Sequence, residues 1–251
     1  MNNNAIVFTL QAKNNTAMHY YAMAYYALET LQPFYDNSFD VILYHDVVDF
    51  DIENDFYNEE YNIVKDFPWV KFIQSEYKEK YNIPAQYRRG DLHDAYMAKW
   101  YHLQETFKLG YEKLFMLDVD VVFFRNPAYL FDEYTYPTSQ QGDDSTIRMI
   151  LGKTGWSSAH VMLHKNFVGG AYNFYDRVAM QRKLICDNSA LLLRQNKITE
   201  KEHDNFCFFS EQYAGQLAIE TQQRFSSFEL TDIYWELPVI DFIDDEFILG
   251  E

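Results

Sequence analysis

Residues 113–127 read Lys-Leu-Phe-Met-Leu-Asp-Val-Asp-Val-Val-Phe-Phe-Arg-Asn-Pro, an apolar run interrupted by Asp118 and Asp120. Residues 114–117 predict a buried strand, and residues 121–124 continue the same β-rich composition. Because burying an unpaired carboxylate is costly, two of them in such a run need a compensating cation. Carboxylate oxygens suit hard divalent metals such as Mg²⁺ or Mn²⁺. The two aspartates converge on one ion most easily if the strand ends at Asp118 and the chain turns.

The segments before this run predict alternating strands and helices. Short apolar strands are expected at residues 5–10, 41–44 and 69–73, and helical patterns at 16–31, around 56–65 and at 92–108. This order predicts an α/β fold with a parallel, doubly wound sheet. In such sheets ligands bind beyond the carboxyl ends of the strands, where the polar loop 11–15 and His45-Asp46 are expected to lie.

The segments after the run are less regular. A strand is expected at 158–163, a helix at 176–195 and a charged loop at 198–205. The polar stretch 137–154 contains Gly142 and Gly152, is followed directly by Gly155, and predicts a mobile lid over the site. No linker or internal repeat divides the sequence, so we expect one domain over residues 1–251.

The composition excludes several classes of partner. The net charge of −17 argues against binding to nucleic acid and to anionic membranes, because both need clustered lysine and arginine. No apolar run approaches the roughly 18 residues of a membrane span, and no targeting signal begins the sequence, so we expect a cytoplasmic protein. The two cysteines, Cys186 and Cys207, match neither a metal spacing nor a disulfide framework.

The Asp-x-Asp pair has two chemical interpretations. In one, a metal ion bridges the carboxylates and the phosphates of a nucleotide and neutralises a leaving diphosphate. In the other, Asp118 is the nucleophile and Asp120 the acid of a metal-dependent phosphohydrolase, with Asp244-Asp245 as further metal ligands. A third possibility is a catalytically inactive binding protein with an acidic surface.

Two blocks of sequence resemble a known family. Ala98-Lys99-Trp, followed by Gly110 to Asp132 with Asp-Val-Asp and then Asn-Pro-Ala-Tyr-Leu-Phe-Asp, is similar to the donor site of GT-A glycosyltransferases. The similarity is strongest to the glycogenin and galactosyltransferase-like type, family 8. Val7 to Leu10 also resembles the first, uridine-binding strand of that family. The resemblance implies a GT-A fold with a Rossmann-like, mostly parallel central sheet flanked by helices. It also implies that the single domain has a nucleotide-sugar and metal-binding half at 1–132 and an acceptor-binding half at 133–251.

The resemblance also implies roles for individual residues. Asp118 and Asp120 would bind Mn²⁺ or Mg²⁺, and Glu211, in Ser210-Glu211-Gln212, would be the catalytic residue that faces the donor sugar. Lys99 or Arg88 would pair with the donor phosphates. The remaining donor-binding residues implied by the family pattern are Thr9, Leu10, Gln11, Ala12, Asp118, Gly169 and Gly170.

Together these residues predict an enzyme that moves a hexose or pentose from a nucleoside-diphosphate donor, UDP-linked, to a glycan or other hydroxyl acceptor. The expected mechanism is retaining. The sequence departs from the family pattern in two places. No histidine follows His203, where family 8 supplies a third metal ligand, and Val168 replaces an asparagine of the glycogenin-like pattern.

Overall fold

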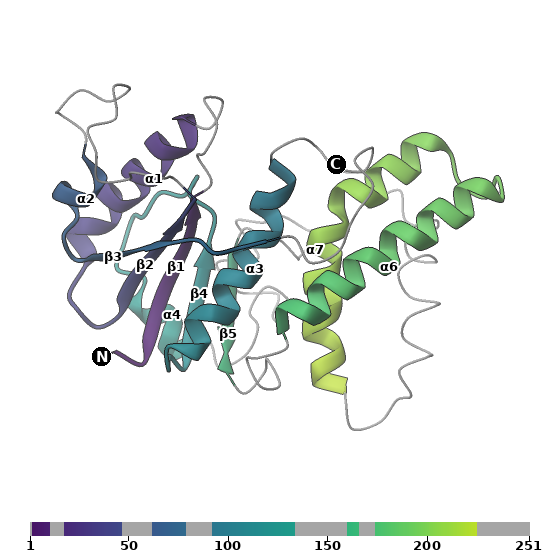
Figure 1. Cartoon of the computed structure of the whole chain (residues 1–251). Coiled ribbons are helices and arrows are strands. Elements are labelled where there is room, and N and C mark those ends of the chain that lie inside the picture. Colours follow the sequence, from purple (N-terminus) through teal and green to yellow (C-terminus); the bar gives the residue numbers. More distant parts are fainter. Residues whose placement is uncertain are drawn as a thin grey trace.

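A five-stranded sheet lies at the centre of the protein (Figure 1). The computed structural model describes residues 2–10, 18–46, 62–78, 92–133, 160–165 and 174–224. The strands are ordered β3-β2-β1-β4-β5 across the sheet. Their bounds are Asn4–Leu10 (β1), Asp40–His45 (β2), Val70–Gln74 (β3), Lys113–Leu117 (β4) and His160–His164 (β5). The first four run parallel and β5 is antiparallel to β4, which confirms the predicted α/β fold with a mostly parallel sheet.

Helices cover both faces of this sheet. One face packs against α3 (Leu92–Lys108), which in turn contacts α6 (Phe174–Arg194) and α7 (Glu200–Arg224). The other face packs against α1 (Met18–Leu31), α2 (Ile63–Asp66) and α4 (Ala128–Glu133). A short 3-10 helix, η2 (Gln32–Phe34), follows α1. Alternate residues of each strand point to opposite faces, so Val7 joins the first cluster and Phe8 the second. Strands buried on both sides are near-continuously apolar, as the sequence of β1 shows.

The predicted helix 92–108 has those bounds in the structure. Trp100, Leu103 and Phe107 repeat at helical spacing and are buried in the core cluster that α3 shares with the sheet, α6 and α7. Gly110 follows the helix with a φ of 101°, a left-handed conformation that favours glycine, and its N–H bonds the Phe107 carbonyl at 3.0 Å. This cap turns the chain directly into β4.

The β-rich composition of residues 121–124 does not produce a strand. β4 ends at Leu117, the chain turns at Asp118, and residues 121–124 form no regular element. Val122 is 56% exposed and Phe124 87% exposed, so these side chains leave the core despite their apolar composition. The early end of the strand agrees with the turn that two converging carboxylates require.

The predicted loop at 198–205 is wrong, because α7 begins at Glu200. Thr199 and Glu202 form a reciprocal capping box: the Thr199 N–H donates to Glu202 Oε2 at 2.6 Å, and the Glu202 N–H donates to Thr199 Oγ1 at 3.2 Å. These bonds satisfy N–H groups that a helix start leaves unpaired. The high charge of the segment is the solvated first turn of a helix.

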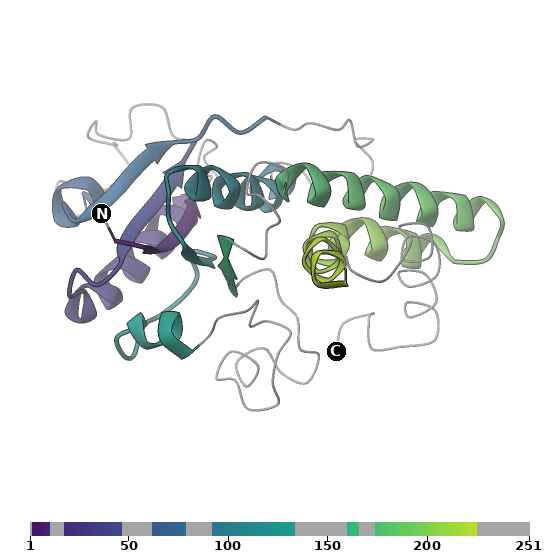
Figure 2. The same ribbon diagram turned by 90° about the horizontal axis from the view of Figure 1, so that it is seen from below.

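α6 and α7 form a long antiparallel pair that extends from the sheet (Figures 1 and 2). Asn196, with a φ of 54°, ends the turn after α6. Buried residues of both helices, among them Val178 and Ala214, belong to the same core cluster as β1, β4 and α3. The apolar core therefore continues from the sheet into the helical pair. Among the described residues, no helix is long and apolar enough to cross a bilayer.

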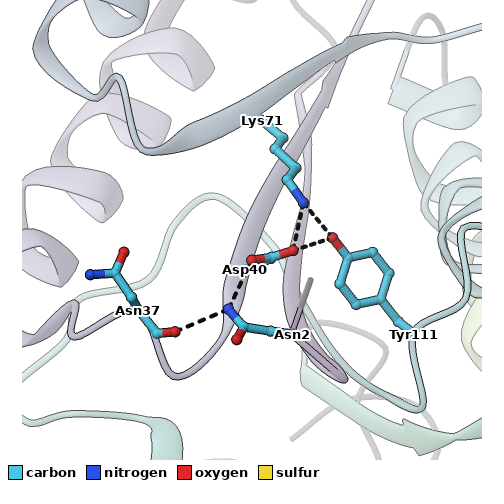
Figure 3. Close-up of polar contacts among 5 residues, drawn as sticks. All are labelled: Asn2, Asn37, Asp40, Lys71 and Tyr111. Carbon is cyan, nitrogen blue, oxygen red and sulfur yellow. Dashed lines mark hydrogen bonds and ion pairs between the residues drawn. The ribbon is translucent and has the colours of Figure 1, made fainter.

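A polar cluster ties the amino ends of the strands together (Figure 3). Lys71 on β3 and Tyr111, just before β4, both donate to the Asp40 carboxylate on β2, and Lys71 Nζ lies 2.7 Å from the Tyr111 hydroxyl. Asn2 donates to Asp40 Oδ1 at 2.9 Å and to the Asn37 carbonyl at 3.0 Å. Burial opposes the charge of Asp40, but the hydrogen bonds from Lys71 and Tyr111 outweigh it and lower the pKa of this carboxyl.

Candidate functional site

The order of the strands creates a switch point between β1 and β4. The chain builds β1, β2 and β3 in one direction and then returns to place β4 on the other side of β1. Phe8 pairs with Leu117, so the next residues along these strands are Thr9 and Asp118. In open α/β sheets the carboxyl ends of strands at such a point form the ligand-binding crevice. Thr9 and Asp118 therefore lie where the topology favours binding.

Asp118 and Asp120 follow β4 directly. The Asp118 side chain is 35% exposed, and Asp120 is exposed. Their oxygens fit a hard divalent cation that takes its remaining ligands from phosphate and water. Among the described residues, however, no group of three or more histidine, cysteine, aspartate or glutamate side chains could hold a metal. The role of the two aspartates as metal ligands stays a prediction.

Lys99 of α3 connects Asp118 to Glu211 of α7. Its Nζ lies 3.4 Å from Asp118 Oδ1 and 3.7 Å from Glu211 Oε1. The side chains of Lys99 and Glu211 are 4% and 8% exposed, so these charges are almost fully removed from water. Three predicted site residues, from three different elements, therefore meet at the carboxyl end of β4.

Electrostatics keep the Lys99 ammonium charged. Burial disfavours the charge, but the carboxylates of Asp118 and Glu211 outweigh it, so the pKa of Lys99 is raised above its ordinary value. A lysine without such partners would lose its proton at this depth. Lys99 therefore fixes the positions of two carboxylates and balances part of their negative charge.

Trp100, the neighbour of Lys99, contacts the same glutamate. Its indole N–H donates a short hydrogen bond to Glu211 Oε1. Trp100 is fully buried, and its ring packs against Phe174 at the start of α6 with 5.8 Å between ring centroids. The Glu211 carboxylate is consequently held by two consecutive residues of α3.

Thr9 reaches a second buried group, His102, one turn after Lys99 on α3. Thr9 Oγ1 lies 2.8 Å from His102 Nδ1, and Ser75 Oγ lies 2.6 Å from His102 Nε2. The imidazole thus joins the carboxyl ends of β1 and β3 through hydroxyl groups. The Thr9 hydroxyl is engaged with this histidine, and Thr9 is paired with Tyr44 in the parallel ladder of β1 and β2. The contact of Thr9 with a nucleotide base stays a prediction.

His102 is neutral at ordinary pH. It is fully buried and stacks on Tyr44 with 4.3 Å between centroids and 2° between planes. Burial, with a smaller contribution from His45, lowers the pKa of His102 from 6.5 to about 3. A neutral imidazole carries one N–H, so one of the two hydroxyls donates to the ring and the other accepts from it.

The other predicted site residues are distributed as follows. Leu10 is fully buried in the core, and its carbonyl accepts from the Asp46 N–H at 3.3 Å. Several predictions lie outside the described residues: Gln11, Ala12, Arg88, Gly169, Gly170, the pair Asp244-Asp245 and the lid at 137–154. The roles assigned to these residues stay predictions.

The structure adds three residues that sequence patterns did not assign to the site. Trp100 has the spacing of a core residue on α3, and nothing in the sequence indicates its hydrogen bond to a residue 111 positions away. His102 and Ser75 likewise become partners through the folding of α3 over the sheet. The one available signal was the presence of Lys99, Trp100 and His102 within one turn of a helix that precedes the Asp-x-Asp strand.

A comparison with families of known proteins finds a match to part of this sequence. The sequence model of the nucleotide-diphospho-sugar transferase family matches residues 60–166, less than half of the chain. This match supports a nucleotide-sugar transferase domain in that part of the protein. It includes Lys99, Asp118 and Asp120, whereas Glu211 lies beyond it. A comparison with curated proteins finds no match.

Two solved structures resemble this chain in part. A candidate nucleotide-diphospho-sugar transferase from Desulfovibrio desulfuricans is 11% identical, with a TM-score of 0.30, and the alignment covers 53% of each chain. The glycosyltransferase GlyE of Streptococcus pneumoniae is 11% identical, with a TM-score of 0.44, over 87% of this chain and 43% of that one. This chain thus spans about half, or less, of the length of these two proteins.

Proposed function

We propose that this protein is a metal-dependent glycosyltransferase that moves a sugar from a UDP-linked donor to a hydroxyl acceptor, with retention at the anomeric carbon. The observation that carries the proposal is the meeting of Asp118, Lys99 and Glu211 beside the switch point of the sheet. The match of residues 60–166 to nucleotide-diphospho-sugar transferases supports the same reaction class.

Asp118 and Asp120 would hold the metal ion. Bound there, Mn²⁺ or Mg²⁺ supplies charge neutralisation for the diphosphate, because carboxylates and diphosphate repel each other without a cation. Both aspartates are accessible to solvent, so a nucleotide can approach them, and Asp118 is already oriented by Lys99. The protein's contribution at this point is a prearranged pair of carboxylates at the end of a rigid strand.

Glu211 supplies a fixed negative charge behind the donor sugar. As the bond between the anomeric carbon and the diphosphate breaks, positive charge develops on the sugar, and a carboxylate nearby stabilises it. The acceptor oxygen then bonds the anomeric carbon on the face the diphosphate leaves, and its proton passes to a diphosphate oxygen. Lys99 keeps Glu211 in place throughout, because a buried carboxylate without a cation would be strongly disfavoured.

Calorimetric binding of UDP with and without Mn²⁺ tests the donor site. In Asp120→Ala we expect Mn²⁺-dependent affinity to be lost while the circular dichroism spectrum stays unchanged. Asp187→Ala is the matched control, because it removes the same charge from an exposed ion pair with Lys183 on α6. Unchanged affinity in Asp120→Ala would refute the metal site.

Turnover of the protein with UDP-, GDP- and CMP-sugars tests the reaction itself. Glu211→Gln keeps the shape of the side chain and removes its charge, so we expect near-normal UDP affinity and a kcat lower by about a hundredfold. Parent-level transfer by this variant would make Glu211 structural. Release of phosphate from simple phosphomonoesters, without sugar transfer, would instead favour the phosphohydrolase.

A further inference from the structure

Glu211 of α7 is oriented by two residues of α3. Its Oε1 atom accepts the indole N–H of Trp100 and also lies 3.7 Å from the Lys99 ammonium. Two donors that converge on one oxygen restrict rotation of the carboxylate about its last carbon–carbon bond. The longer Lys99 contact alone would define that rotation poorly, since an ammonium on a flexible chain acts as a point charge.

Gly215 makes room for the indole ring. It lies one helical turn after Glu211 on α7, so both residues share one face of the helix. A Cβ atom at position 215 would be 2.2 Å from Cζ2 and 2.6 Å from Cη2 of Trp100. The N–H edge of the ring therefore lies along α7 between Gly215 and Glu211. Glycine is unfavourable in the middle of a helix, and here the close approach of the ring requires it.

We propose that Trp100 is a positioning residue for Glu211, and that Gly215 admits its ring to the surface of α7. The indole N–H and the Lys99 ammonium together hold the carboxylate toward Asp118. The catalytic consequence rests on the proposed function, whereas the contact itself does not. Neither residue needs to touch the substrate, because each acts through the orientation of Glu211.

Trp100→Phe tests the positioning role. It keeps an aromatic ring between α3, α6 and α7 and removes the N–H donor. Hydrogen bonds to charged groups are worth enough that we expect kcat to fall by about tenfold or more, with the KM for the donor within about twofold of the parent. Trp69→Phe is the matched control, because the buried indole nitrogen of Trp69 finds no hydrogen-bond partner among the described residues. It should leave kcat and KM unchanged.

Gly215→Ala reaches the same contact from the other helix. Alanine favours helix, so a purely local effect would stabilise α7. We expect instead that the new Cβ displaces the indole and lowers kcat about as much as Trp100→Phe does. In a Glu211→Gln background, Trp100→Phe should have less than about a twofold further effect, because both changes act on one interaction.

The indole N–H resonances provide a readout that does not depend on turnover. The protein has four tryptophans, and the Trp100 signal is the one missing from Trp100→Phe. We expect Glu211→Gln to shift this signal upfield and to leave the Trp69 signal in place. If Trp100→Phe fails to fold, the signal that moves in Glu211→Gln and in Gly215→Ala identifies the contact.

Each outcome decides one question. An unmoved Trp100 signal in Glu211→Gln, or a parent-like kcat in folded Trp100→Phe, would overturn the positioning role. A parent protein that transfers no sugar from any donor would refute the proposed function, and the resonance shift would then still decide whether Trp100 holds Glu211.

Discussion

Replacing His102 with glutamine should flatten the dependence of stability on pH. In the folded protein the imidazole is buried between Thr9, Ser75 and the Tyr44 ring, and its pKa is lowered from 6.5 to about 3. The unfolded chain has no such environment, so there the histidine binds a proton as the pH falls below 6.5. Between the two pKa values the unfolded state binds more protons than the folded state. The free energy of unfolding must therefore decrease as the pH is lowered through this range.

The magnitude follows from the width of this window. For one titrating group, each pH unit between the folded and unfolded pKa values lowers the free energy of unfolding by about 1.4 kcal/mol. From about pH 7.5 to about pH 4.5 the stability lost through His102 is therefore about 2–3 kcal/mol, a large part of the 5–15 kcal/mol typical of a domain. Glutamates begin to bind protons near the acid end of this range, so the difference between the parent and the variant, rather than the parent slope alone, isolates the histidine.

Urea unfolding at several pH values in this range measures the effect. The comparison is between the slope for the parent and the slope for His102→Gln, because the substitution also removes hydrogen bonds and lowers stability at every pH. His164→Gln is the control: His164 lies at the end of β5, and burial lowers its pKa by a smaller amount than for His102. Parallel slopes for the parent and His102→Gln would show that His102 titrates as an ordinary histidine and would refute the reasoning.

Two further predictions concern a buried ion pair and a helix cap. Lys99→Met should reduce the free energy of unfolding by about 3 kcal/mol, because it removes the Lys99 cation from the buried Glu211 carboxylate, and adding Glu211→Gln should restore part of the loss. Urea titration of the single and double variants measures this, and a single variant as stable as the parent would contradict the ion pair. Thr199→Ala should cost about 1 kcal/mol through loss of the capping box at the start of α7. Lys201→Ala, an exposed change in the same turn, is its control, and equal melting temperatures for both variants would count against the cap.

Local patterns in the sequence predicted most of the fold. Apolar runs gave the strands, because strands buried on both faces have little room for polar residues. The spacing of Trp100, Leu103 and Phe107 gave α3, and Gly110 marked its end. The start of α7 was missed although Thr199 and Glu202 form a recognisable capping box, because the charge of the segment suggested a loop. Residues 121–124 have a β-rich, apolar composition but form no strand, because apolar composition alone does not require burial in a sheet.

The site was predictable to the extent that it depends on residues close in sequence. Asp118 and Asp120 follow from one apolar strand, and Lys99 from a pattern that spans 19 residues. Glu211 was selected by a weak resemblance, and its distances to Lys99 and Trp100 could come from the structure alone. No periodicity in α7 indicates which of its residues will face α3, because that choice depends on how the α6–α7 pair packs against the sheet.

The cluster of Asn2, Asp40, Lys71 and Tyr111 has a consequence for engineering the protein. It lies at the amino ends of strands whose carboxyl ends carry the proposed chemistry, so the five residues of β4 separate the two by about 16 Å. Asp40 and Lys71 form a neutral pair, and the field of a neutral pair decays faster with distance than that of a single charge. Replacing the pair by an apolar one of similar shape would therefore leave the electrostatic potential at Asp118 nearly unchanged. The thermal stability of the protein can therefore be redesigned at the amino ends of the strands independently of the proposed site at their carboxyl ends.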